Sequence, residues 1–225
     1  LAAKESGEVT PERERELRSE AATSGRKPVA YYDFTFSAVK SISVYEAALR
    51  ATGQTELADK VVEAHNRAVQ VALEYAESRV IFTRTGSHAR TVTGNESIGR
   101  HEAGTGAVWT VWAHSTSREN EPQMHTHAAL LNRTVTEAGK IGALDGASFR
   151  AYKEAIAAAY ERATEQFVTE ETGALFELRP DGKAREIVGI DPEVMAEAST
   201  RRGQVTGLVA ERVALYRDRH GKEPD

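Results

Sequence analysis

The chain has 225 residues, of which 40% are hydrophobic and 28% charged, and it contains no cysteine. This composition is typical of a globular protein, and no apolar run approaches the roughly 18 residues of a membrane-spanning helix. The lack of cysteine excludes disulfides, thiolate metal sites and cysteine nucleophiles. It also favours a reducing compartment, so we expect a soluble, cytoplasmic protein.

The net charge of −5 argues against a general nucleic-acid binder, because phosphate binding depends on Lys and Arg. The acidic excess, however, falls mainly within residues 134–200. Earlier residues are therefore compatible with a local basic groove, and equally with an ordinary mixed-charge surface.

The first half of the chain predicts three helices and a strand. Thr10 and Pro11 begin a short charged helix that ends near residue 22. Residues 29–36, VAYYDFTF, alternate as a strand does, and helical spacing follows over residues 37–51. Residues 55–80 form a long amphipathic helix that contains His65, which we interpret as structural or solvent-facing because no other donor lies one turn away.

The second half begins with short β-like runs that predict an antiparallel meander, over residues 80–85, 89–94, 106–116, 123–134 and 141–146. A long helix over residues 148–172 should end before Gly173. Residues 174–189 predict a hairpin around a Pro-Asp-Gly turn, and a last helix runs from Asp191 to about Arg219. Because strands and helices are partly segregated, we expect an α+β fold, an antiparallel sheet backed by helices, with additional C-terminal helices and a hairpin.

Three of the seven histidines lie in one stretch, HSTSRENEPQMHTH, at residues 114–127. His125 and His127 are two apart in a predicted strand, so both side chains leave the same face, with Cα atoms roughly 7 Å apart. The polar link SRENEP predicts a hairpin that returns His114 to their side. The pattern therefore predicts three imidazoles converging on one divalent metal ion. An isolated His-x-His pair would more often be two surface residues without a common ligand.

The same stretch resembles the signature of the MobF-class conjugative relaxases, which belong to the HUH endonucleases. Residues 33–43, DFTFSAVKSIS, are similar to one family segment, although Val39 stands where the family usually has proline. Residues 114–132, HSTSRENEPQMHTHAALLN, are similar to its three-histidine segment. The resemblance covers nearly the whole chain from residue 29.

The resemblance implies an enzyme that binds single-stranded DNA at a plasmid transfer origin and nicks and religates one strand through a phosphotyrosyl intermediate. His114, His125 and His127 would hold the metal, and Asp33 would orient a ligand imidazole. The resemblance implies Mg or Mn as the working ion. Three imidazoles intrinsically suit Zn, Ni or Cu better, so a purified sample is expected to accept another divalent metal.

Further site residues follow from the same segments. Ser37, Lys40, Arg118 and Arg133 are candidate phosphate contacts. The aromatic candidates for base stacking are Tyr31, Tyr32, Trp109 and Trp112, although we expect burial for both tryptophans. Expected partners are the transfer-origin DNA, as a single strand with a hairpin or duplex arm, and proteins of the relaxosome and conjugation machinery. We expect no membrane segment and no small-molecule cofactor.

The family's nucleophilic tyrosines lie on a strand near the N-terminus, upstream of the aspartate strand, and residues 1–28 contain no tyrosine. We therefore expect residues 1–225 to be a relaxase domain truncated at its N-terminus and cut from a longer multidomain protein, and inactive without that tyrosine. Tyr31 shares a strand face with Asp33, but the family places no nucleophile there.

Three alternatives remain open. A non-nicking module would use the metal only to grip DNA phosphate, and a rolling-circle replication initiator of the same superfamily would use related chemistry. A trihistidine hydrolase or oxygenase of small molecules would need an enclosed apolar pocket. Binding of single-stranded DNA separates the first two from the third.

Overall fold

The computed structural model describes residues 29–85 and 100–223, together with residues 12, 15, 16 and 18. The helix predicted over residues 10–22 lies mostly outside these residues, and the strand predicted over residues 89–94 lies entirely outside them. Both segments that resemble the relaxase signature, residues 33–43 and 114–132, lie within the described part of the chain.

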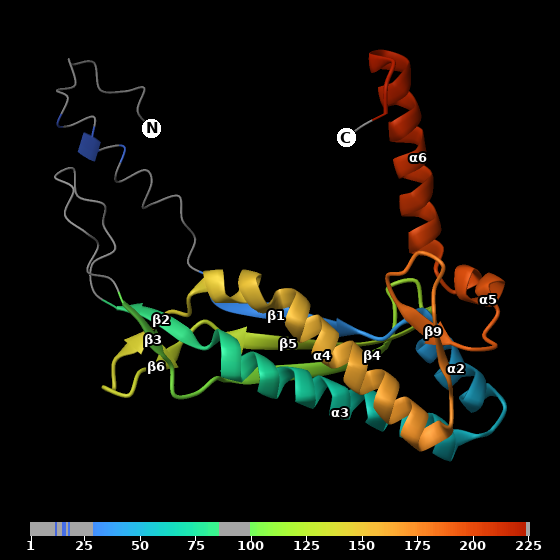
Figure 1. Ribbon diagram of the computed structural model, residues 1–225, viewed down its shortest axis with the longest axis horizontal. Coiled ribbons are helices and arrows are strands. Elements are labelled where there is room, and N and C mark those ends of the chain that lie inside the picture. Colours follow the sequence, from blue (N-terminus) through green and yellow to red (C-terminus); the bar gives the residue numbers. More distant parts are fainter. Residues whose placement is uncertain (1–11, 13–14, 17, 19–28, 86–99, 224–225) are drawn as a thin grey trace.

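A three-stranded antiparallel sheet forms the centre of the molecule (Figure 1). Strand β5 (Pro122–Leu131) lies between β1 (Tyr31–Ser37) and β4 (Trp109–Thr116). Its central place explains its sequence, since Ala128 and Leu130 are fully buried while alternate residues reach the opposite face. The predicted α+β fold with an antiparallel sheet backed by helices is confirmed.

The antiparallel meander predicted over residues 80–146 does not form one sheet. β4 and β5 pair as consecutive antiparallel strands, but the third strand of their sheet is β1, from the first half of the chain. The remaining short strands of this region make separate two-stranded ribbons: β2 (Phe82–Thr85) with β3 (Arg100–Ala103), and β6 (Thr134–Val135) with β7 (Ile141–Gly142).

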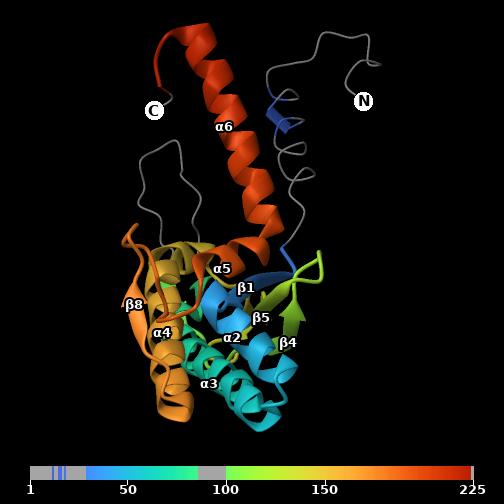
Figure 2. The ribbon, with the colours of Figure 1, turned by 90° about the vertical axis from the view of Figure 1, so that its right-hand side faces the viewer.

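Helices α2 (Lys40–Ala51), α3 (Thr55–Val80) and α4 (Gly146–Thr172) lie on one side of the sheet, and α3 packs along α4 (Figures 1 and 2). α2 begins three residues later than residue 37, since Ser37 still pairs with His125 in the strand. The side chain of Asp145 accepts a hydrogen bond from the Ala147 amide and so caps α4. The helix ends at Gly173, whose φ of 74° is the left-handed conformation that glycine adopts most readily.

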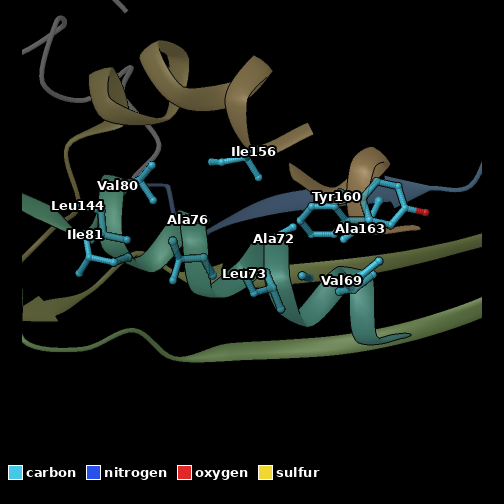
Figure 3. Close-up of a cluster of buried hydrophobic side chains, with 14 residues drawn as sticks. Val69, Ala72, Leu73, Ala76, Val80, Ile81, Leu144, Ile156, Tyr160 and Ala163 are labelled. Carbon is cyan, nitrogen blue, oxygen red and sulfur yellow. The ribbon is translucent and has the colours of Figure 1, made fainter. Parts of the chain in front are cut away.

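A cluster of buried side chains joins the sheet to α3 and α4 (Figure 3). Helix α3 contributes alanines and valines at helical spacing, which allows close approach to α4 and to the sheet. Phe36 and Tyr160 complete the contact, with ring centroids 5.3 Å apart. This packing fixes one face of the sheet, and no helix of the described residues covers the other face (Figure 1).

The C-terminal part contains the predicted hairpin, β8 (Phe176–Leu178) paired with β9 (Arg185–Ile187). The predicted single last helix is instead two, α5 (Pro192–Glu197) and α6 (Thr200–His220). The helix breaks because the Thr200 amide donates to the Glu121 carboxylate rather than to a carbonyl of the preceding turn. α6 then extends away from the body (Figure 2). Among the described helices, none combines the length and the apolar character that crossing a bilayer requires.

Candidate metal centre

The β4–β5 hairpin brings the three histidines together on the open face of the sheet. His114 lies directly opposite His125 in the strand register, and His127 lies two residues further along β5. The ring centroid of His114 is 5.0 Å from that of His125 and 5.7 Å from that of His127, and the latter two are 5.3 Å apart. The predicted hairpin is therefore confirmed, and it places the three imidazole rings next to one another.

Two of the imidazoles are oriented by hydrogen bonds that their Nδ1–H groups donate. Nδ1 of His125 lies 2.9 Å from the Gln123 carbonyl oxygen, which can only accept. Nδ1 of His127 lies 2.9 Å and 3.2 Å from the two carboxylate oxygens of Asp33, on the neighbouring strand β1. Both rings therefore donate from Nδ1, which leaves the lone pair of Nε2 available to a ligand.

Three imidazole nitrogens are suitable ligands for a divalent ion, and the distances between the rings are close to those of a metal-bound set. Metal–nitrogen bonds of about 2.0 to 2.1 Å place the centroids of two imidazole ligands roughly 5 Å apart. The observed separations are at or slightly above this value. Within the described residues no three His, Cys, Asp or Glu side chains already stand in a metal-binding arrangement.

A groove of about 810 Å³ begins at the histidines, and its lining includes Ser37, Lys40 and Arg118. Charged and polar side chains dominate this lining, unlike the enclosed apolar pocket that a small-molecule enzyme would need. Arg133 does not line the groove, and its guanidinium donates to the Asn132 carbonyl. Three of the four predicted phosphate contacts thus share one surface with the histidines.

Lys40 is held at the edge of this groove by a hydrogen bond from Nζ to the Pro122 carbonyl oxygen, 2.9 Å away. Partial burial lowers the pKa of its ammonium group, while the charges of Glu121 and Glu186 act in the opposite direction. Lys40 therefore links the start of α2 to the start of β5, at the edge of the surface that a phosphate would approach.

Sequence reasoning missed two further cations of the groove, Arg179 and Arg201. Arg179 comes from the β8–β9 hairpin and lies 3.5 Å from the Glu186 carboxylate, and Arg201 comes from the first turn of α6. No local pattern marks these residues, because only tertiary packing brings their segments to the groove.

The aromatic residues divide between the two faces of the sheet. The expected burial is wrong for Trp112, which is 52% exposed, because it faces the open side beside His127. Trp109 is half-buried, and its Nε1 donates to Glu77. A second groove of about 560 Å³ runs from His114 and His127 along exposed apolar side chains, namely Tyr31, Val108, Trp112 and Leu131.

His65 has the structural position expected of it. Its side chain is 1% exposed and lies on the opposite side of the sheet from the three other histidines. Burial lowers its pKa to about 4, with a smaller contribution from His125, so the imidazole is neutral near pH 7.

The antiparallel sheet and the histidine cluster on its open face define an α+β domain of the relaxase type. The chain belongs to the TrwC relaxase family, whose profile matches residues 4–225. This result confirms the family that residues 33–43 and 114–132 indicated.

Similar proteins agree with this assignment. The multifunctional conjugation protein TraI of Escherichia coli K12 is 35% identical over 106 residues, which are 46% of this chain and 5% of TraI. A metal-bound structure of the conjugative relaxase TrwC with oriT DNA superimposes with a TM-score of 0.68 and 28% identity, over 84% of this chain and 59% of TrwC. A structure of TrwC with a 27-mer DNA comprising the recognition hairpin and the cleavage site superimposes with a TM-score of 0.67 and 28% identity, over 92% of this chain and 71% of that TrwC chain.

Proposed function

We propose that this chain acts as the relaxase domain of a larger conjugation protein, which nicks and religates one DNA strand at a plasmid transfer origin. The observation that carries the proposal is the cluster of His114, His125 and His127, with Asp33 bonded to the last of them, at the head of a groove whose lining holds more cationic than anionic side chains. Family membership supports the same reaction.

The three histidines would hold a divalent ion through their free ring nitrogens, with Mg or Mn as the working metal. Such an ion supplies charge that polarises the scissile phosphate. Asp33 keeps the His127 ring in the tautomer that presents Nε2, and the Gln123 carbonyl does the same for His125. The metal-bound and copper-bound structures of TrwC support a divalent metal without fixing its identity.

The groove would bind the DNA strand beside the histidines. Ser37, Lys40 and Arg118 face it and would contact phosphates. Arg133 lies outside it and would contact a more distant part of the DNA. Exposed Tyr31 and Trp112 would stack on bases in the second groove. The recognition hairpin in the TrwC complex supports a folded DNA arm as a second binding element.

In the proposed reaction a tyrosine hydroxyl attacks the scissile phosphorus, forming a 5′-phosphotyrosyl bond and releasing the 3′-oxygen as a hydroxyl. We assign this nucleophile to a strand upstream of β1, as in the family, rather than to Tyr31. The reaction would take place in the cytoplasm of a bacterial donor cell, together with other relaxosome proteins.

The test is intact mass under denaturing conditions after incubation with Mn²⁺ and single-stranded transfer-origin DNA. We expect a covalent DNA adduct on the full-length product of the gene and none on its His125→Ala variant, while DNA affinity changes little. An adduct that survives His125→Ala would reject the metal-dependent mechanism. Binding without any adduct would favour the non-nicking module.

The 225-residue chain and its Tyr31→Phe variant serve as the second comparison. We expect neither to form an adduct. An adduct on the chain that disappears in Tyr31→Phe would move the nucleophile to Tyr31.

A further inference from the structure

A buried hydrogen-bonded chain lies directly behind the histidine cluster. Nε2 of His65, on α3, is 2.8 Å from the Thr126 hydroxyl, and Nδ1 is 2.9 Å from the Tyr160 hydroxyl on α4. The exposed fractions of His65, Thr126 and Tyr160 are 1%, 2% and 3%. A neutral imidazole has one donor and one acceptor, so these two hydroxyls satisfy both ring nitrogens.

This arrangement is unusual for its surroundings. The neighbours of His65 on the buried side of α3 are apolar, including Val61, Ala64 and Ala68. Burying polar groups is unfavourable unless they are paired, whereas a fully paired network in a low dielectric fixes one geometry. An aliphatic side chain would fill the space without that requirement. The polar chain therefore specifies a position rather than merely filling the core.

The position it specifies is that of Thr126, the residue between His125 and His127. Alternation along β5 sends the Thr126 side chain into the core and the two imidazoles to the open face. The bond to His65 holds this residue against α3, and the bond from His65 to Tyr160 joins α4 to the same point. Any shift of Thr126 would move the backbone that carries both imidazoles.

We propose that His65, Tyr160 and Thr126 form a positioning network that sets the orientation of His125 and His127 for metal binding. This inference rests on the proposed metal centre. The three residues touch neither metal nor DNA, and they act through the backbone of β5 from the opposite side of the sheet.

The experiment compares Thr126→Val, which removes the hydroxyl at nearly constant volume, with Thr126→Ser, which keeps it. Thr83→Val is the matched control, because Thr83 is 1% exposed and its hydroxyl donates to the Ala143 carbonyl away from the histidines. Tyr160→Phe removes the other end of the network and keeps its ring. For each variant the Mn²⁺ dissociation constant, the histidine-ring 1H–15N spectrum of the metal-free chain and the unfolding midpoint are measured.

Groups that contact a metal ligand directly change affinity by roughly 10- to 100-fold, so this indirect network should weaken Mn²⁺ binding by about three- to tenfold. We expect that loss, with shifted ring signals of His125 and His127, in Thr126→Val and Tyr160→Phe. Thr126→Ser should retain affinity. Thr83→Val should lower the unfolding midpoint as much as Thr126→Val while leaving affinity and ring signals unchanged.

Unchanged affinity and ring signals in Thr126→Val, or equal losses in Thr83→Val, would overturn the positioning role. The His127→Ala variant tests the metal centre itself. If it binds Mn²⁺ as tightly as the unsubstituted chain, both the metal centre and the positioning network are rejected.

Discussion

The two faces of the central sheet serve different purposes although the same strands form both. On β5, Thr126, Ala128 and Leu130 pack against helices, whereas His125 and His127 face an open groove. The inner face is covered by α3 and α4, and the outer face is lined by polar and aromatic side chains. A period of two residues thus lets one strand carry the core and the site independently.

A substitution on the inner face should have the greatest effect. Leu130→Ala removes a fully buried side chain and should reduce the free energy of unfolding by about 2 to 5 kcal/mol, measured by urea denaturation. Leu131→Ala, one residue further along the strand, removes a side chain that is 44% exposed and should cost less than about 0.5 kcal/mol. Equal losses would show that the two faces do not differ in their contribution to stability.

Acidification should weaken the inner face through His65. Its pKa is about 4 in the folded chain, below its ordinary value of 6.5. Its stabilising contribution is therefore complete above pH 6.5 and is lost as the pH falls towards 4, because the unfolded chain then binds a proton that the folded chain does not. The loss should reach about 3 kcal/mol, at 1.36 kcal/mol for each unit of pKa.

The measurement is the free energy of unfolding between pH 7 and pH 4 for the unsubstituted chain and for His65→Gln. The variant is less stable at pH 7, but its stability should fall less steeply over this range. Parallel pH profiles would contradict a buried neutral imidazole at this position.

A substitution on the outer face should affect metal binding rather than the stability of the fold. Asp33→Asn keeps a hydrogen-bond acceptor but removes the carboxylate charge beside His127, and should weaken Mn²⁺ binding by about 10- to 100-fold. The unfolding midpoint should stay nearly constant. Titration calorimetry and thermal unfolding of the same samples provide the check, and a large loss of stability without weaker metal binding would make Asp33 a structural residue.

Trp112 should give the weakest response of the four. Since stacking of a base on an aromatic ring contributes about 1 to 3 kcal/mol, Trp112→Ala should weaken single-stranded DNA binding by about tenfold. Because its side chain is 52% exposed, we expect little change in the free energy of unfolding. Trp109→Ala, which alters the half-buried tryptophan of the same strand, should show the opposite pattern in fluorescence-anisotropy and unfolding measurements.

The sequence was sufficient for the features that depend on local pattern. Alternation placed His125 and His127 on one face, and a polar link between two strands predicted the return of His114. Gly173 located the C-terminal end of α4, and the Pro-Asp-Gly turn located the β8–β9 hairpin, whereas α4 begins two residues before the predicted start at residue 148 because Asp145 caps it. The lack of a second donor near His65 separated it correctly from the cluster.

Features that depend on distant partners could not be predicted in this way. The placement of β5 between β1 and β4 requires a pairing across two helices. Alternation puts Trp112 on the same face as His114, but the expectation that large aromatic side chains are buried was given more weight, so Trp112 was misplaced. The break before α6 depends on the carboxylate of Glu121, 79 residues earlier in the chain. Arg179 and Arg201 line the groove only because the fold brings the C-terminal hairpin and the start of α6 beside the central sheet.

The extended position of α6 bears on hydrogen exchange. Almost all of its side chains are exposed, including Val205, Leu208 and Leu215. Most of the stability of helices in proteins comes from packing against the core, which α6 lacks, so its amides should open by local helix–coil transitions. Amides of α3, in contrast, should exchange only when the core unfolds. A single chain should therefore show two exchange regimes, and anything that docks on α6 would be detected as a slowing of the faster one.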